Sequence, residues 1–367
     1  MDRRELMTAG VAVAVTATLA SAAKAAASYG MTKGAPDIKS VGPLAFGPAG
    51  VLFVADPVGA KVFALDVGAG RAMAAQPVSI DKLDMRLAAF LGAAPADIAV
   101  RDVAVQPGSN IVFISVMRGS GAAAVPALVK IDAKGELSQV ALTNIAFAQT
   151  TVEKAPGLDD KRTAGRQPLR SVTVTDLAYT DGTVLIAGAS NEEFTSAFRR
   201  VAFPFNGAAQ LNSLEIFHVS HGRFETASPI TSFVPYGGAG SVLAAYTCTP
   251  LVQFSLTGAA AGSQVKGKSV ADLGPGSTPT DMLHFRQGGE DYFLVANSRH
   301  PLMKVARRDI DKQEALIKQA DHVGAARKEL PQAGVSRLAN LGDGHVLMMQ
   351  QDPAAGLSLR SYAVETL

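Results

Sequence analysis

The stretch Val51-Leu-Phe-Val-Ala-Asp56 is a short apolar run that ends in a polar residue, as expected of a buried strand leading into a loop. Five further runs of this kind follow at intervals of roughly 50 to 70 residues. They lie at 111–116, 184–191, 242–246, 292–297 and 345–350. Repetition of one such unit predicts an array that either closes on itself or stacks.

Each run is flanked by two more short apolar segments, which in the first unit are Pro43-Leu-Ala-Phe46 and Lys61-Val-Phe-Ala-Leu-Asp66. Turn residues such as Thr180-Asp-Gly182 separate the first segment of a unit from the second. The irregular spacing is unusual for a solenoid and suits propeller blades of three or four strands with insertions. We therefore expect an all-β chain folded as a six-bladed β-propeller, with five or seven blades as the alternatives.

The N-terminal segment is typical of a cleaved export signal. Arg3 and Arg4 precede a short run rich in Ala and Thr, and Lys24 follows it. The paired arginines and modest hydrophobicity favour a twin-arginine signal over residues 1–27, with a Sec signal as the alternative. The rest of the chain, 28–367, is predicted to be a single propeller domain, periplasmic or secreted, without a membrane span.

Composition narrows the function classes. The net charge of +2 argues against a nucleic-acid partner, and the single cysteine excludes an internal disulfide framework. One short helix is predicted at 80–91, in an insertion between blades, with Leu83, Leu87 and Leu91 packed on the outside of the blades. We expect a monomer whose partner is a small molecule or a periplasmic protein.

In a propeller, the loops that follow the second strands lie on one face, where functional residues gather. The first strands of three blades begin at this face with a carboxylate. We expect these carboxylates to form an acidic collar around the central tunnel, and packed carboxylates repel one another unless a cation or a proton lies among them. The three residues are Asp102, Asp176 and Asp281.

The segment Ile216-Phe-His-Val-Ser-His-Gly-Arg-Phe-Glu225 is a candidate transition-metal site. Two imidazoles and a carboxylate, here His218, His221 and Glu225, can bind Zn²⁺, Cu²⁺ or Fe²⁺. Histidines three residues apart on a strand point to opposite faces, so they converge only if the strand ends between them. The alternatives are ordinary hydrogen-bonded loop histidines and acid–base catalysis without a metal.

Cys248 ends the second strand of the fourth unit, near Tyr246. Its thiol is a candidate metal ligand or redox group, and a buried small apolar residue is the alternative. The predicted catalytic set is His221, Glu192, Cys248 and Tyr246.

The first unit, 50–63, resembles an NHL-type propeller repeat, and the chain from about Ser40 onward resembles exported bacterial propeller proteins of unassigned function. The sequence segments shared with them include Ser190-Asn-Glu-Glu-Phe194 and Ala245-Tyr-Thr-Cys-Thr-Pro250. Lactonases of the six-bladed, SMP-30-like class hold a catalytic Ca²⁺ near the tunnel. By analogy with them, oxygen ligands of the right chemical type are Asn191, Glu192, Asp281 and Asn297.

Two functions are therefore considered. In the first, a divalent metal, either calcium or a transition metal, assists hydrolysis of a lactone or ester, or redox chemistry on a small molecule. In the second, the propeller is a non-catalytic periplasmic platform that binds a partner protein or ligand.

Overall fold

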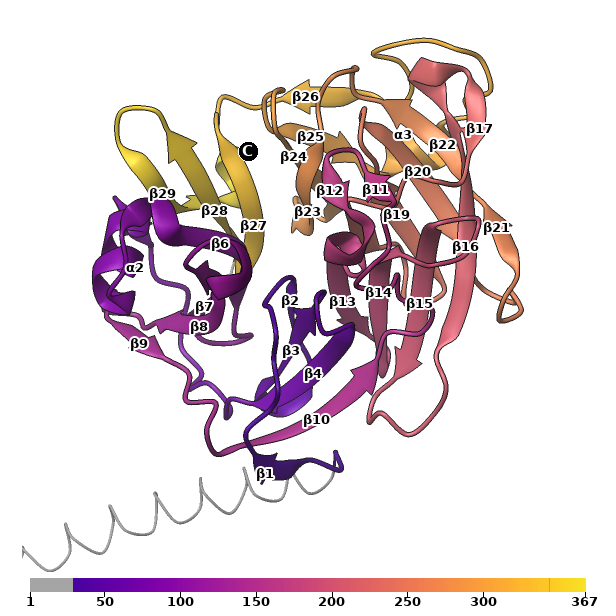
Figure 1. Ribbon diagram of the computed structural model, residues 1–367. Coiled ribbons are helices and arrows are strands. Elements are labelled where there is room, and N and C mark those ends of the chain that lie inside the picture. The colour runs from indigo at the N-terminus through magenta and orange to yellow at the C-terminus, as the bar shows by residue number, and fades with distance from the viewer. Residues whose placement is uncertain (1–28, 343) are drawn as a thin grey trace, which may run out of the picture.

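The computed structural model describes residues 29–342 and 344–367, so the predicted export signal lies outside the described residues. Six antiparallel sheets stand around a central axis as the blades of a β-propeller (Figure 1). This confirms the predicted fold class and blade number. Within the described residues, no helix is both long and apolar enough to span a membrane.

We number the blades by the chain order of their innermost strands. Blade 1 contains β2 (Leu44–Phe46), β3 (Val51–Asp56), β4 (Lys61–Asp66), β10 (Ile145–Thr151) and β1 (Thr32–Gly34). Blade 2 contains β6 (Ile98–Val105), β7 (Val112–Arg118), β8 (Val125–Ile131) and β9 (Leu137–Gln139). Blade 3 contains β13 (Asp176–Thr180), β14 (Thr183–Ala189), β15 (Ser196–Ala202) and β16 (Gln210–His218), to which β17 (Arg223–Glu225) and β21 (Gln264–Lys266) are added.

The remaining three blades have four strands each. Blade 4 contains β18 (Ser232–Pro235), β19 (Ser241–Ala245), β20 (Pro250–Ser255) and β22 (Lys268–Asp272). Blade 5 contains β23 (Pro279–Gln287), β24 (Glu290–Asn297), β25 (Met303–Ala306) and β26 (Arg327–Glu329). Blade 6 contains β27 (Val335–Gly342), β28 (His345–Asp352), β29 (Gly356–Ala363) and β5 (Ser79–Ile80).

Shorter elements lie between the blades. A two-stranded hairpin is formed by β11 (Thr163–Ala164) and β12 (Gln167–Pro168). The described α-helices are α2 (Leu83–Leu91) and α3 (Arg307–Lys312). The short 3-10 turns are η1 (Pro48–Gly50), η2 (Pro95–Asp97), η3 (Gly121–Ala123), η4 (Leu169–Val172), η5 (Val219–His221) and η6 (Val364–Thr366).

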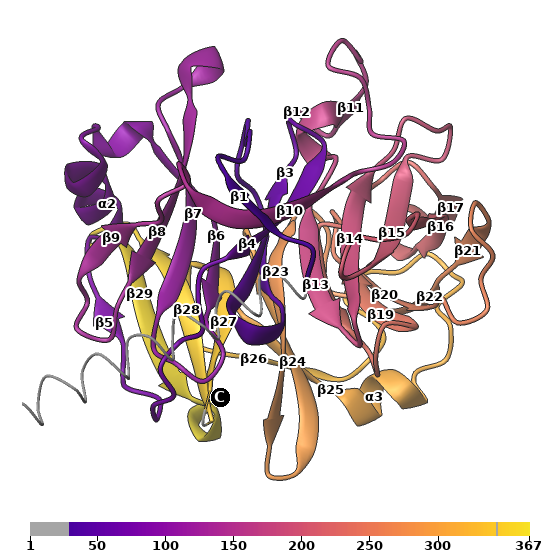
Figure 2. The ribbon, with the colours of Figure 1, turned by 90° about the horizontal axis from the view of Figure 1, so that it is seen from below.

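The order of the blades around the ring differs from their order in the chain. The innermost strands pack in the circular order β2, β6, β27, β23, β18 and β13, which places blade 1 between blades 2 and 3. After β4 the chain crosses to blade 6, where β5 pairs with β29, and then builds blade 2. It returns to blade 1 as β10, which crosses in front of the blades in the view from below (Figure 2).

Most of the apolar core lies between neighbouring blades. Six large buried clusters fill the six interfaces of the ring, and each draws on the two blades that flank it. Phe53 of β3, for example, packs against Phe203 and Tyr179 of blade 3. Burial on both sheet faces explains why the second strands read as continuous apolar runs rather than as alternating patterns.

The predicted helix is present but begins later than expected. Leu83, Leu87 and Leu91 are buried against blades 2 and 6, as predicted, and Gly92 ends the helix in the left-handed conformation. The prediction that the helix starts at residue 80 is wrong, because Ile80 belongs to β5 and Lys82 adopts a left-handed conformation before the first turn. Helix α3 was not predicted.

Candidate metal centre

The candidate site lies where the outer strand of blade 3 ends. Strand β16 stops at His218, and η5 turns the chain so that His221 comes back beside it. The two imidazole rings stack with their centroids 3.9 Å apart and an interplanar angle of 29°. The strand therefore ends between the two histidines, as we expected to be necessary for the two rings to converge.

Glu225 of β17 holds both rings. Its Oε2 lies 2.7 Å from His218 Nδ1, and its Oε1 lies 2.8 Å from His221 Nδ1 and 2.8 Å from Arg223 Nε. Burial alone would raise the pKa of Glu225, but the hydrogen bonds from Arg223, His221 and His218 together lower it to about 2. An ionised carboxylate accepts hydrogen bonds, so each ring donates from Nδ1, and a ring that carries no second proton has a lone pair at Nε2.

Cys248 approaches the same place from blade 4. The ligand-capable atoms of His218, His221 and Cys248 all lie within 4.8 Å of one another. Cys248 and the following Thr249 both have positive φ angles, 63° and 62°, which residues other than glycine rarely adopt. This turn is closed by a hydrogen bond from Thr249 N to Tyr246 O at 2.9 Å. The backbone strain thus presents the thiol toward the two imidazoles.

His218 Nε2 is the most informative atom of the cluster. The His218 residue is 2% exposed, and its Nε2 has no hydrogen-bond partner among the described residues. Burial lowers the pKa of His218, an effect that Glu225 opposes, so the ring is favoured in its neutral form. A buried imidazole lone pair without a donor is costly in a protein interior and is what a metal ion would satisfy.

One thiolate and two imidazoles suit a borderline or soft transition metal such as Zn²⁺ or copper, rather than a hard cation. Glu225 had been predicted as a ligand, but both of its oxygens are engaged by the Nδ1 atoms. It takes the role of the carboxylate that orients ligating histidines. His221 is half-exposed, its side chain being 43% accessible, so this side of the cluster is open to solvent.

The other predicted site residues lie elsewhere. Glu192 is exposed and pairs with Lys154 at 2.7 Å, and the neighbouring Asn191 is exposed as well. Tyr246 is completely buried in the apolar cluster between blades 3 and 4, where it cannot touch a substrate. Asn297 is buried and donates to the carbonyl of Val295. Glu192 and Asn191 are thus exposed on the surface, whereas Tyr246 lies in the turn of Cys248 with its side chain buried in the apolar cluster.

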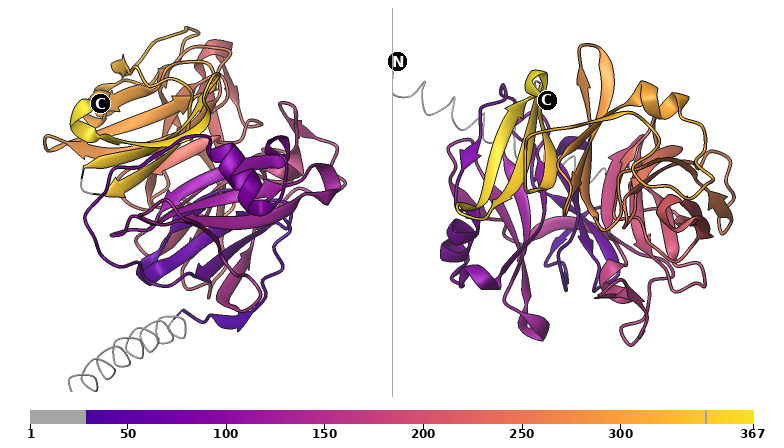
Figure 3. Two further views of the ribbon diagram at one scale, coloured as in Figure 1. Left: turned by 90° about the vertical axis from the view of Figure 1, so that its left-hand side faces the viewer. Right: turned by 90° about the horizontal axis from the view of Figure 1, so that it is seen from above.

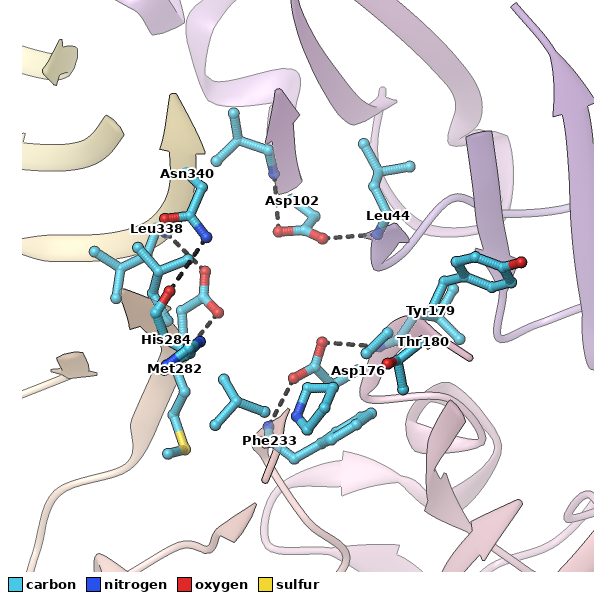
Figure 4. Close-up of a pocket in the computed structure, with 17 residues that line it drawn as sticks. Leu44, Asp102, Asp176, Tyr179, Thr180, Phe233, Met282, His284, Leu338 and Asn340 are labelled. Carbon is cyan, nitrogen blue, oxygen red and sulfur yellow. Dashed lines mark hydrogen bonds between the residues drawn. The ribbon is translucent and has the colours of Figure 1, made fainter. Parts of the chain in front are cut away.

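Asp281 lines the central tunnel together with Asp102 and Asp176, as the predicted acidic collar requires. Figure 4 shows Asp102 and Asp176 in this cavity. The tunnel cavity has a volume of about 330 Å³. Neither Asn191 nor Asn297 is among the residues that line it. The structure therefore does not assemble the calcium ligand set suggested by analogy with lactonases.

The three tunnel carboxylates follow one pattern. Each accepts a hydrogen bond from the backbone N–H that follows it and another from the innermost strand of the next blade in the ring. The second donors are Leu44 N for Asp102, Phe233 N for Asp176 and Leu338 N for Asp281, at 2.7, 2.8 and 2.7 Å. These carboxylates thus join the blades in three pairs, 2 with 1, 3 with 4 and 5 with 6.

Close spacing and burial change the acidity of these groups. Burial raises the pKa of Asp176 to about 7, and the Asp102 carboxylate adds to this effect. Burial also raises the pKa of Asp281 well above its ordinary value, with further contributions from Asp102 and Asp176. Arg337 opposes the rise at Asp102 and Asp281. Either a proton or a cation among the three carboxylates would relieve their repulsion.

Sequence reasoning missed two polar residues near these sites. Arg337 precedes Leu338, whose backbone N–H donates to Asp281. Asp272 is the last residue of β22, near the candidate ligands His218 and Cys248. Both lie in ordinary strand patterns, and nothing in their sequence context marks them.

Fold and site together define a β-propeller with a candidate transition-metal centre between the outer strand of blade 3 and the turn that joins β19 and β20 of blade 4. No protein-family model matches the chain, and no curated protein matches it.

Three solved structures show the level of structural similarity. Aldose sugar dehydrogenase from Streptomyces coelicolor, with PQQ bound, is 11% identical, covers 90% of this chain and 96% of its own, and has a TM-score of 0.36. A putative glucose dehydrogenase from Thermus thermophilus is 12% identical over 90% and 99% of the two chains, with a TM-score of 0.38. A streptogramin B lyase is 9% identical over 91% and 97%, with a TM-score of 0.33. Similarity at this level says nothing of what this chain binds or catalyses.

Proposed function

We propose that this protein is an exported metalloenzyme whose metal ion is bound by His218, His221 and Cys248. The observation that supports this most directly is the buried, unpartnered Nε2 of His218, which faces a second imidazole and a thiol. Glu225 fixes both rings through their Nδ1 atoms, an arrangement that raises the basicity of ligating histidines.

The proposed reaction is metal-assisted hydrolysis of a small lactone or ester. Three protein ligands leave a fourth position for water, as in catalytic rather than structural zinc sites. A metal held by His218, His221 and Cys248 would activate water for attack on the ester carbonyl carbon, with the bond to the alcohol oxygen breaking and a proton of the water passing to the leaving alcohol. The half-exposed edge at His221 gives such a substrate access. The resemblance to NHL-type and SMP-30-like propellers supports the lactone class by analogy of fold alone.

A second candidate function is redox chemistry on a small molecule. One thiolate and two imidazoles are also the ligand set that favours copper. The identity of the bound metal separates the two functions, since zinc has no redox chemistry of its own. The non-catalytic platform is the outcome if no metal binds.

Export remains a proposal from the sequence. A twin-arginine route would carry the protein across the membrane already folded, with its metal in place. Replacing both Arg3 and Arg4 with lysine should retain the precursor in the cytoplasm if that route is used. Unchanged export of the variant would favour the Sec alternative.

The test of the proposed function is elemental analysis of protein purified from the periplasm of its native host. We expect about one zinc or copper ion per chain, and loss of this ion in His218→Ala. The matched control is His284→Ala, because His284 also pairs with a carboxylate, Asp291 at 2.9 Å, but lies in blade 5. Protein without a transition metal, or metal retained in His218→Ala, would overturn the proposal.

A further inference from the structure

Asp272 is a buried carboxylate with one unused oxygen. The residue is 0% exposed and is the last residue of β22. Its Oδ1 accepts hydrogen bonds from Gly274 N at 3.0 Å and from His322 N at 3.4 Å. Its Oδ2 is buried and has no hydrogen-bond partner among the described residues. An acceptor left in this condition is destabilising unless a cation or a donor lies beside it.

The fold places Asp272 next to the metal ligands. In the sheet of blade 4 it lies opposite Pro250, two residues after Cys248. The next residue along, Leu273, donates from its backbone N to Thr249 O at 3.1 Å. On the other side of β22, Ser269 donates to the carbonyl of Phe217, the residue before His218, at 2.6 Å. The end of β22 therefore lies between the turn that carries Cys248 and the strand that carries His218.

A connection from blade 5 covers this region. After α3 the chain crosses β22, where Leu316 N donates to Ser269 O at 2.9 Å, and reaches η5, where Gln319 Nε2 donates to Ser220 O at 2.9 Å. Figure 1 shows this connection outside β22 near β17, and the right-hand view of Figure 3 shows it from above. It returns past Asp272, whose backbone N donates to Val323 O at 2.9 Å. The connection helps to keep solvent from the Asp272 carboxylate.

Asp272 and His218 act on each other electrostatically. Burial lowers the pKa of His218, and the Asp272 carboxylate is among the charges that oppose this. Both His218 Nε2 and Asp272 Oδ2 are acceptors, because Nδ1 carries the proton of the ring. Without a further proton the two groups cannot satisfy each other, and because burial raises the pKa of Asp272, a proton on its Oδ2 is the alternative to a metal-bound water. A metal ion that holds a water molecule satisfies both, with the ion binding Nε2 and the water donating to Oδ2.

Asp272 is not part of the set of atoms that lie within 4.8 Å of one another. This separates it from the three candidate ligands, while the contacts of Leu273 with Thr249 and of Ser269 with Phe217 place the end of β22 beside the segments that carry two of them. We propose that Asp272 accepts a hydrogen bond from the water molecule at the fourth position of the metal, and so orients that water toward a bound substrate. The inference rests on the proposed metal centre and makes the fourth position the reactive one.

Azide binding to the cobalt-substituted protein tests this inference without a substrate. Co²⁺ replaces zinc in sites of this kind, and its visible spectrum reports both thiolate ligation and exchange at the fourth position. Azide would take the place of the water, and the negative charge of the Asp272 carboxylate would weaken the binding of this anion. We therefore expect Asp272→Asn to bind Co²⁺ normally and to bind azide at least about tenfold more tightly.

Asp321→Asn is the matched control, because Asp321 is a nearby carboxylate but is exposed. It should leave azide affinity within about twofold of the unsubstituted protein, since exposed charges are screened. In Asp272→Asn the amide oxygen can still accept the hydrogen bond from Gly274 N–H. If this variant does not fold, Asp272→Ser is the second variant, since its hydroxyl is a smaller acceptor.

The outcomes are distinct. Unchanged azide affinity in a folded Asp272 variant would overturn the inference, and so would loss of Co²⁺ binding, which would make Asp272 a direct ligand. Failure of the unsubstituted protein to bind Co²⁺ through its thiolate would instead overturn the metal centre itself.

Discussion

At the scale of single residues, the site depends on which atom of each side chain is already engaged. Glu225 uses both oxygens on the Nδ1 atoms of His218 and His221, and this leaves their Nε2 atoms available for the proposed metal. A carboxylate in this position fixes the ring orientations and the tautomers before the metal arrives. Glu225 is therefore a positioning residue, although its sequence spacing first indicated a ligand.

Glu225→Gln should weaken Zn²⁺ binding by about 10- to 100-fold without abolishing it, because the three ligands remain but lose their common hydrogen-bond partner. Competition with a chromophoric chelator would measure the affinity. Glu215→Gln is the matched control, since Glu215 lies on the same β16, is equally exposed at 15%, and pairs only with Lys266. An unchanged affinity in Glu225→Gln would show that the carboxylate does not orient the ligands.

The residue types of the site could be predicted from sequence in part. His218, His221 and Glu225 lie within eight residues of one another, so the end of a strand was enough to bring them together. Cys248 was predicted to end the second strand of the fourth unit, but β19 ends at Ala245 and Cys248 lies in the turn that follows it. Glu192 follows β14 and Asn297 is the last residue of β24, both at the ends of second strands, but sharing a face of the ring does not fix how far apart two residues lie around it.

At the scale of elements, α2 seals the outside of the interface between blades 2 and 6. Leu83 and Leu87 are completely buried there, within the same apolar cluster as Ile80 of β5. Leu87→Ala should lower the free energy of unfolding by about 2–5 kcal/mol through lost apolar contact and a residual cavity. Urea denaturation would measure this change.

Met85→Ala is the control for this helix, because Met85 is 53% exposed and its loss should change the free energy by less than about 0.5 kcal/mol. Equal effects of the two substitutions would contradict the assigned packing of the helix.

The inner three strands of every blade were predicted because burial on both faces of the sheet produces continuous apolar runs in the sequence. The outer strands were mostly missed for the opposite reason. Strand β26 reads Arg-Lys-Glu and β5 has only two residues, so neither carries a pattern. The ring order was missed as well, because it depends on Ser79 and Ile80 pairing with residues about 280 positions away, which no local signal reports.

At the scale of the whole molecule, three carboxylates join the six blades in pairs around the tunnel. The pKa of Asp176 is raised from 3.8 to about 7 in the folded state. The folded state therefore binds more protons than the unfolded chain between these values. The stabilising contribution of Asp176 is fully present below pH 3.8 and is lost as the pH rises through about 7.

Asp176→Asn removes this titration. The variant loses one acceptor for the N–H groups of Leu177 and Phe233, so we expect it to be less stable than the unsubstituted protein at about pH 5. This deficit should shrink by on the order of 1–3 kcal/mol by about pH 8, where the unsubstituted protein carries the repelling carboxylate. Urea denaturation of both proteins at the two pH values would measure it, and a deficit that stays constant or grows would contradict the raised pKa.

The central claim is that this propeller holds a transition metal between blades 3 and 4. Anomalous X-ray diffraction from crystals of the metal-loaded protein, collected at the absorption edge of the metal found by elemental analysis, tests it most directly. We predict one strong peak within about 2.0–2.3 Å of His218 Nε2, His221 Nε2 and Cys248 Sγ. A peak confined to the tunnel among Asp102, Asp176 and Asp281, or no peak beside His218, would contradict the account.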